Sequence, residues 1–217
     1  KVVLATGETY HVFNRSIAKE DIFSSKANLN KALEIVDFYR FPHKLRLSKF
    51  KSLNKEIKKA YVSSVKNLFS LVEIYTYSFM PNHYHFLLKQ LQDKGISRFI
   101  SNFQNSFAKI FNLKNSRNGA LFQNQFKAVR IETDEQFLHV SRYVHLNPVT
   151  AFLIEFPDLA NYQWTSFGIY AQNKESLFVN AKELIGMIGS FYKYSKFVED
   201  QVDYQRTLEK IKNLTLE

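Results

Sequence analysis

The 217-residue sequence contains no cysteine, and it has only four prolines and six glycines. Without cysteine the chain has no disulfide, no thiolate metal site and no cysteine nucleophile, and we expect it to work in a reducing cytoplasm. The scarcity of proline and glycine argues against a flexible linker or a low-complexity region. Since no apolar run approaches the roughly 20 residues of a membrane span, we expect no membrane partner.

Acidic side chains are also in short supply. Twenty Asp and Glu face thirty Lys and Arg, which leaves a formal net charge of +10. A chain this basic usually meets a polyanion, and nucleic acid is the first candidate, although a membrane-surface or ribosome-adjacent protein would show the same charge. The basic residues concentrate in residues 42–67, where Glu56 is the single acid. We predict a basic insertion here, which either follows a DNA backbone or lies in solvent.

Hydrophobic periodicity predicts the order of the elements. Period-two alternation predicts four strands, at residues 8–16, 68–80, 83–89 and 125–132. Helical spacing predicts three main helices, at residues 28–41, 95–114 and 133–148, and short helices after residue 151. This order predicts an α+β fold, a ferredoxin-like antiparallel sheet with helices on one face. Residues 1–151 would form the catalytic domain, and residues 152–217 a C-terminal helical extension.

The predicted helix 133–148 has recognisable ends. Thr133 and Gln136 form a capping box at its start. Pro148 is expected to end the helix, because the residue before a proline avoids the helical region.

Two histidines stand one residue apart at the start of the predicted strand 83–89. Side chains alternate along a strand, so His83 and His85 point the same way, roughly 7 Å apart, and Tyr84 faces the core. Two imidazoles at this spacing can bind one metal ion. The alternative is a half-exposed sheet face that carries two histidines and no metal.

A second pair of polar residues lies on the predicted helix 133–148. Tyr143 and Asn147 are four residues apart and share a face of that helix. This arrangement suggests a tyrosine nucleophile beside a metal ligand. The phenol has a pKa of about 10, so it needs help to attack at neutral pH. A divalent cation helps by polarising a phosphoryl oxygen. Two imidazoles and an amide oxygen suit Mg²⁺ or Mn²⁺, with Zn²⁺ as an alternative, while an ordinary buried Tyr143 is the competing interpretation.

Three segments occur in a recognisable order: MPNHYHFLL, GALFQNQFKA and RYVHLNPV. Together they resemble the REP-associated tyrosine transposases, a branch of the insertion-sequence single-tyrosine HUH transposases, in which a hydrophobic residue separates two histidines. The match extends from about Tyr10 to Ala151. Asn124 and Gln125 depart from the family, which usually has Gly and Arg there, so we expect an altered phosphate contact.

The resemblance implies a role for each matching residue. His83 and His85 would be the metal ligands, Asn147 a polar third ligand, and Tyr143 the nucleophile that becomes a 5′-phosphotyrosine while freeing a 3′-hydroxyl. It also implies a ferredoxin-like fold, a divalent metal cofactor (Mg or Mn) and single-stranded DNA next to short hairpins as the substrate.

Five further residues are candidates for DNA contacts: Arg15, Phe122, Gln123, Lys127 and Arg142. Phe122 and Gln123 could meet a base by stacking and hydrogen bonding, although Phe122 could equally be core. Alternation puts Lys127 and Arg130 on opposite faces, and Lys127 is the one that we expect to contact DNA. Arg142 points about 100° away from Tyr143, so a structural ion pair is equally expected.

Three further histidines are expected to be ordinary. His11 and His139 are lone histidines, and His145, on the face of the helix opposite Tyr143, is expected to pack or to form hydrogen bonds.

The predicted function is that of a metal-dependent single-stranded DNA endonuclease and strand transferase acting through Tyr143, as a monomer. Three alternatives stay open. The chain could be a nucleic-acid-binding regulator of the same fold that has lost catalysis, or a metal-dependent hydrolase that uses water. It could also be a basic structural protein with an incidental histidine pair.

Overall fold

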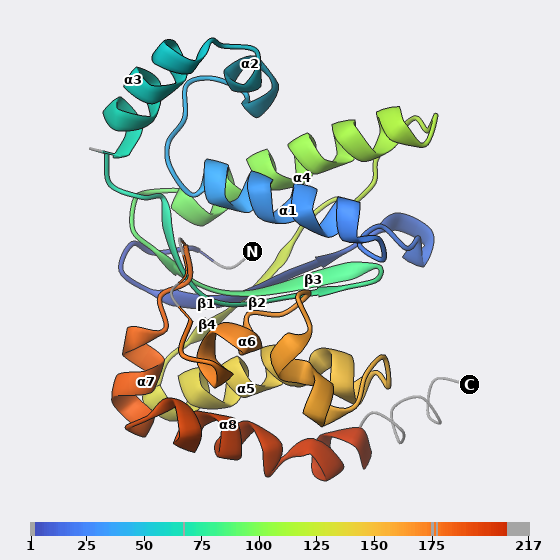
Figure 1. Cartoon of the computed structure of the whole chain (residues 1–217), viewed down its shortest axis with the longest axis vertical. Coiled ribbons are helices and arrows are strands. Elements are labelled where there is room, and N and C mark those ends of the chain that lie inside the picture. Colours follow the sequence, from blue (N-terminus) through green and yellow to red (C-terminus); the bar gives the residue numbers. More distant parts are fainter. Residues whose placement is uncertain (1–2, 67, 175, 177, 208–217) are drawn as a thin grey trace.

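A four-stranded antiparallel sheet crosses the middle of the molecule, with helices on either side of it (Figure 1). The structure, a computed structural model, describes residues 3–66, 68–174, 176 and 178–207. Asn67, in the predicted insertion, and residues 208–217 of the predicted extension lie outside the described residues. The strands are β1 (Thr9–Arg15), β2 (Val72–Met80), β3 (His83–Gln90) and β4 (Lys127–Ile131).

Helices connect these strands and follow the last of them. The α-helices are α1 (Lys26–Tyr39), α2 (Leu47–Lys51), α3 (Lys55–Lys66), α4 (Gly95–Lys114), α5 (Asp134–Thr150), α6 (Phe167–Ala171), α7 (Lys182–Ile188) and α8 (Phe191–Glu199). Two 3-10 helices accompany them, η1 (Ile17–Lys19) and η2 (Phe156–Asn161). Within the described ranges, no helix has both the length and the apolar character that a membrane span requires.

The strand order confirms the predicted ferredoxin-like sheet. The strands lie in the order β2-β3-β1-β4, and every neighbouring pair is antiparallel. Helix α1 leads from β1 to the hairpin β2–β3, and α4 leads from that hairpin to β4, which is the split βαβ connection expected from the sequence. The central strands β3 and β1 are therefore far apart in sequence and adjacent in space.

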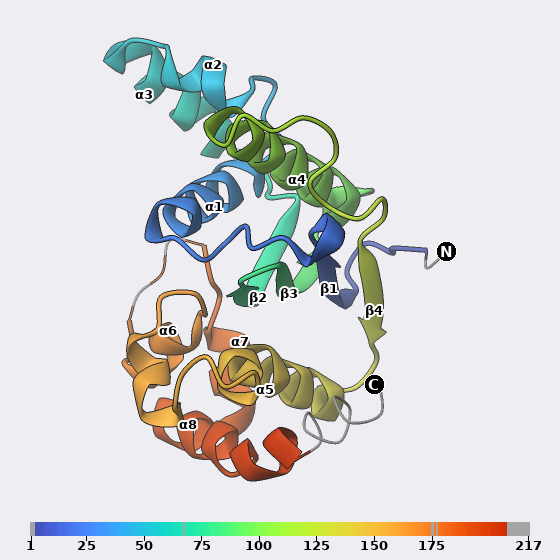
Figure 2. The same cartoon turned by 90° about the vertical axis from the view of Figure 1, so that its right-hand side faces the viewer.

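The helices lie on both faces of the sheet, which corrects the prediction that they cover one face. Helices α1 and α4 form one layer, and α5 and the helices after it form the other (Figures 1 and 2). Strand β3 shows the reason, because it is buried on both sides. Tyr84 and Phe86 pack on Phe103 of α4, with ring centroids 5.3 and 5.9 Å apart, whereas His85 meets Tyr143 of α5. A sheet with two largely apolar faces needs a helical layer on each.

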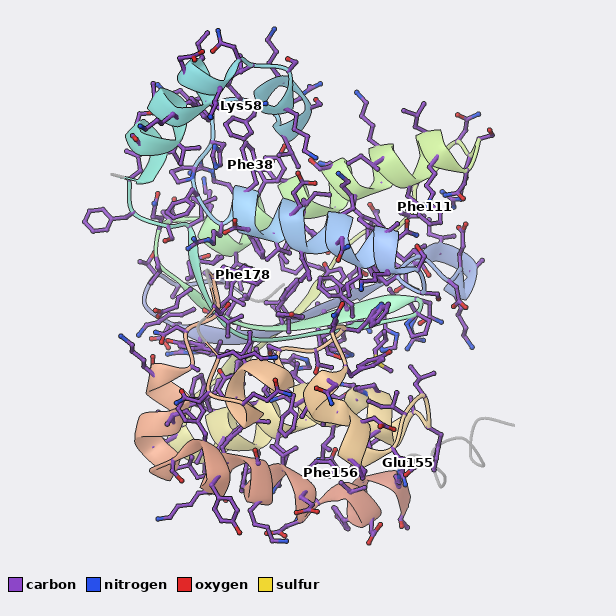
Figure 3. All side chains as sticks on the ribbon, in the orientation of Figure 1. Phe38, Lys58, Phe111, Glu155, Phe156 and Phe178 are labelled. Atoms are coloured by element: carbon purple, nitrogen blue, oxygen red, sulfur yellow. The ribbon has the colours of Figure 1, made fainter. Side chains whose placement is uncertain are left out.

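The basic segment forms α2 and α3, beyond α1 and on the side of the sheet away from α5 (Figure 1). Phe38 of α1 lies between α1 and this segment, with its ring 5.3 Å from that of Phe50 in α2 (Figure 3). Lys51 pairs with Glu34 of α1. Lys55 and Lys59 are exposed, so the outer face of this segment carries accessible positive charge.

Helix α5 begins as predicted and ends later than predicted. The Thr133 side chain accepts a hydrogen bond from the Gln136 amide at 3.1 Å, which confirms the cap. Pro148 lies inside the helix, which continues to Thr150, so the predicted end at Pro148 is wrong. A proline lacks the amide hydrogen that would bond the carbonyl four residues earlier. The Asn147 side chain donates to that carbonyl, of Val144, at 3.4 Å and to the carbonyl of Tyr143 at 3.0 Å.

A buried hydrogen-bond chain joins α5 to the segment after Ala151. The Ser166 hydroxyl lies 2.7 Å from His145 Nε2, and the Tyr194 hydroxyl lies 2.8 Å from His145 Nδ1. Tyr194 in turn donates to Ser141 at 3.0 Å, and Ser166 accepts from the backbone amide of Tyr77 in β2 at 2.9 Å. All members of this chain are buried, so it holds α5 between the sheet and α8. The predicted division at residue 151 stays a prediction.

We expect the stability of the fold to depend on pH through His145. Burial lowers the pKa of His145 from its usual 6.5 to about 3, so below pH 6.5 the unfolded chain binds a proton that the folded chain does not. Stability is therefore lost as the pH falls through this range. Between pH 7 and pH 5 the loss from this one group is about 2 kcal/mol.

His145→Gln removes this titration. Urea unfolding at pH 7 and pH 5 should show that the gap in unfolding free energy between wild type and His145→Gln narrows by this amount at pH 5. Equal gaps at the two pH values would show that His145 does not titrate differently in the two states.

Candidate active site

The β2–β3 hairpin places the two histidines side by side. The strands turn at Pro81 and Asn82, and His83 opens β3 opposite Met80. The rings of His83 and His85 have centroids 5.1 Å apart, on the sheet face that α5 covers, as the alternation predicted. His83 Nδ1 donates a hydrogen bond to the side-chain oxygen of Asn82 at 2.7 Å. With its proton on Nδ1, His83 would bind a cation through Nε2.

Helix α5 brings Tyr143 to the same place. The Tyr143 ring stands perpendicular to the His85 ring, with centroids 5.6 Å apart. Tyr143 is 41% exposed, whereas most of the helix around it is buried. Asn147 lies one turn further and is buried, and its amide nitrogen bonds the two helix carbonyls described above. The amide oxygen is the Asn147 atom that remains for a ligand.

These side chains surround one cavity of about 440 Å³. It is lined by Phe13, Asn14, Arg15, Met80, His83, His85, Gln123, Lys127, Tyr143, Asn147, Thr150 and Ala151. Seven of the nine predicted site residues are among them. The structure therefore brings together residues from β1, β3, β4, α5 and the segment before β4.

The basic side of the cavity comes from β1 and the chain that leads into β4. The backbone amide of Gln123 donates to the Arg15 carbonyl at 2.9 Å, and the Asn14 side chain donates to the Gln123 carbonyl at 3.0 Å. These bonds hold the segment before β4 against the end of β1. Lys127 pairs with Phe13 across the strands and lines the cavity, while Arg130 forms an ion pair with Glu8 at 2.9 Å. The choice of Lys127 over Arg130 thus agrees with the geometry.

Two predicted DNA contacts, Phe122 and Arg142, are wrong. Phe122 is buried among Tyr84, Phe103 and other rings of the α4 layer, so its alternative assignment to the core is the correct one. Arg142 is buried beneath α8, where its guanidinium lies 4.2 Å from the centre of the Phe197 ring and donates to the Phe197 carbonyl. Helical geometry turns Arg142 away from Tyr143 and toward α8. It forms no ion pair with a carboxylate among the described residues.

His11 is a site residue that the sequence analysis treated as ordinary. Its Nε2 lies 2.9 Å from Nδ1 of His85, and its ring edge approaches Tyr143 with centroids 5.7 Å apart. Burial lowers the pKa of His11 to about 4, so this imidazole is neutral at physiological pH. The alternation of residues 8–16 indicates the side of the sheet on which His11 lies. His11 and Phe13 share the face opposite the core residues Tyr10 and Val12.

The donor atoms at this cavity could hold a divalent cation. Within the part of the chain that the structure describes, no group of three or more His, Cys, Asp or Glu side chains is placed to bind a metal ion. The available set is His83, His85 and the amide oxygen of Asn147. Two imidazoles and one neutral oxygen could hold Mn²⁺ or Mg²⁺, which accept water and phosphate oxygens in their remaining positions, and Zn²⁺ stays the alternative because it also binds imidazole.

Comparisons with known proteins bear on the family and the fold of the chain. Residues 42–147 match the family model described as "Transposase IS200 like". This range begins with the basic segment and includes His83, His85, Tyr143 and Asn147. No match is found among the curated proteins.

Among solved structures, the chain is similar to a REP-associated tyrosine transposase bound to a REP hairpin. The two share 16% sequence identity with a TM-score of 0.54, over 79% of this chain and 84% of that one. At this identity the likeness shows a common fold. Both findings support the resemblance predicted from the three segments: residues 42–147 match the IS200-like transposase family model, and the chain has the fold of a REP-associated tyrosine transposase.

Proposed function

We propose that the chain cuts and rejoins single-stranded DNA through Tyr143, with a divalent cation bound near His83, His85 and Asn147. The observation that carries the proposal is the position of Tyr143 against the histidine pair in one basic cavity of one chain. The similar solved structure binds a REP hairpin, which supports a DNA hairpin as the partner here.

The chemistry is an exchange of one phosphodiester for another. The Tyr143 oxygen attacks a DNA phosphorus, the bond from phosphorus to the 3′-oxygen breaks, and a 5′-phosphotyrosine and a free 3′-hydroxyl result. The phenol proton leaves and the 3′-oxygen gains a proton. Because the new diester conserves the bond energy, a different 3′-hydroxyl can reverse the reaction and join the strands. A bound Mn²⁺ or Mg²⁺ would polarise the phosphate and screen its charge.

The chain's own residues supply position and charge. Tyr143 is partly exposed at the cavity, so its hydroxyl can meet a phosphate that enters from solvent. Lys127 and Arg15 place two cations at the same cavity, where they would hold the backbone on either side of the reacting phosphate. Gln123, fixed against β1, offers an amide to a base or a sugar.

We also propose that the active site is complete in a monomer. Tyr143 lies on a helix that the buried chain of Ser166, His145 and Tyr194 holds against its own sheet. The Arg206 side chain donates to the Val149 carbonyl at 3.1 Å, which adds a second tie at the end of α5. A helix tied this way does not need a partner chain to reach the histidines.

Tyr143→Phe should abolish the covalent intermediate, because it removes the attacking oxygen and keeps the ring. Wild type, incubated with Mn²⁺ and single-stranded hairpin DNA labelled at its 3′ end, should give a labelled protein band on a denaturing gel, because the 5′-phosphotyrosine retains the fragment on the 3′ side of the cut. Tyr192→Phe is the matched control, since Tyr192 is an exposed tyrosine on α8 outside the cavity, and it should behave as wild type.

Cleavage that persists in Tyr143→Phe without a protein band would contradict the tyrosine mechanism and favour the metal-dependent hydrolase that uses water. Binding without cleavage in all three proteins would favour the catalytically silent regulator.

Lys127→Ala should weaken binding of the same DNA, and Arg130→Ala should not. The two substitutions remove the same charge from the same strand, but only Lys127 faces the cavity. Affinity falls as the salt concentration rises. Loss of one phosphate contact should make the negative slope of log affinity against log salt concentration shallower by about 0.7 for single-stranded DNA. Fluorescence anisotropy at several salt concentrations measures this slope. Equal effects of the two substitutions would mean that the cavity is not the DNA site.

A further inference from the structure

His11 contacts both His85, a metal-ligand candidate, and Tyr143, the proposed nucleophile. It lies on β1, the strand next to β3, two residues before Phe13, which is paired with His85. The His11 and His85 rings are nearly parallel, at 15°, with centroids 5.1 Å apart, and they share the 2.9 Å contact between His11 Nε2 and His85 Nδ1. Both rings also contact Tyr143 through an edge-on arrangement.

The contact at Nδ1 decides which nitrogen of His85 can bind a metal. A neutral imidazole has one N–H and one lone-pair nitrogen, and the hydrogen bond made by one nitrogen sets the role of the other. If His85 Nδ1 donates to His11 Nε2, the lone pair of His85 is on Nε2. A histidine ligand in a protein almost always donates its second N–H to a neighbouring acceptor in this way.

We propose that His11 is the positioning residue for His85: it accepts the His85 Nδ1–H hydrogen bond, and so holds the ring and its tautomer ready for a divalent cation at Nε2. This inference rests on the metal site of the proposed function. Asn82 has the equivalent place at His83, where its side-chain oxygen accepts from Nδ1 at 2.7 Å. Each histidine of the pair thus has its own acceptor, one from the turn before β3 and one from the neighbouring strand.

The two acceptors differ in what they contribute beyond the hydrogen bond. Asn82 adjoins His83 in the chain and lies in the turn. His11 comes from a different strand, packs against both Phe13 and His85, and contacts Tyr143. A change at His11 should therefore act on the cation through His85 while leaving His83 in place.

The test measures Mn²⁺ affinity of the full chain without DNA, from the electron paramagnetic resonance signal of unbound Mn²⁺. His11→Phe keeps an aromatic ring and removes the acceptor, and we expect it to weaken Mn²⁺ binding by about 10- to 100-fold. His11→Gln offers a side-chain oxygen as the acceptor, and we expect it to keep affinity within about threefold of wild type, because the hydrogen bond is retained. His11→Leu should repeat the loss without a ring, and melting of the metal-free proteins checks that each variant is folded.

Failure of the His11 role and failure of the metal site give different results. His83→Ala should lose Mn²⁺ binding, and wild type should show it. Suppose that wild type binds Mn²⁺ and His83→Ala does not. If His11→Phe and His11→Leu then bind Mn²⁺ as tightly as wild type, the role of His11 is refuted and the metal site stands. A loss in His11→Gln as large as in His11→Phe would likewise refute the hydrogen-bond role. If wild type binds no Mn²⁺, or His83→Ala binds it unchanged, the metal site itself fails and the role of His11 fails with it.

Discussion

The alternation of side chains along β3 is the constraint on which the rest of the structure depends. One set, with Tyr84 and Phe86, enters the aromatic layer beneath α4, and the other, with His83 and His85, faces α5. A one-residue shift of register would exchange the two sets and put imidazoles among phenylalanines. The strand must therefore be covered on both faces, and the second cover is the helix that carries Tyr143.

Much of this could be predicted from sequence because it depends on local periodicity. The strand and helix order, the aromatic stripe on α4 and the shared face of His83 and His85 follow from spacings within a few residues. The site residues on one chain segment, such as Tyr143 and Asn147, could be paired for the same reason. Local spacing alone does not bring the histidine pair of β3 together with Tyr143 and Asn147 of α5. The ferredoxin-like order of the elements and the resemblance do so, and the same order places β1 beside β3.

The failures came from contacts between distant segments. The position of Arg142 next to Tyr143 suggests a DNA contact. The helix that covers Arg142, α8, lies about fifty residues later, so the sequence of the helix 133–148 does not show that Arg142 is buried. Pro148 does not end α5 because the side chain of Asn147 replaces the missing donor, a compensation that a dipeptide rule omits. The neighbours of His11 come from β3 and α5, so the residues around it in sequence carry no sign of its place in the site. Only the pairing of β1 with β3, which the ferredoxin-like order implies, brings His11 to His85.

The most direct test of the account is to identify the amino acid that becomes attached to DNA. Wild-type protein is incubated with a single-stranded hairpin and Mn²⁺, digested with trypsin and nuclease, and its peptides are sequenced by tandem mass spectrometry. Cleavage after Arg142 gives a peptide that begins with Tyr143 and also contains Tyr162 and Tyr170, so fragment ions must locate the added mass. We predict a nucleotide phosphate on Tyr143. Cut DNA with no modified peptide, or the mass on any other residue, would contradict it.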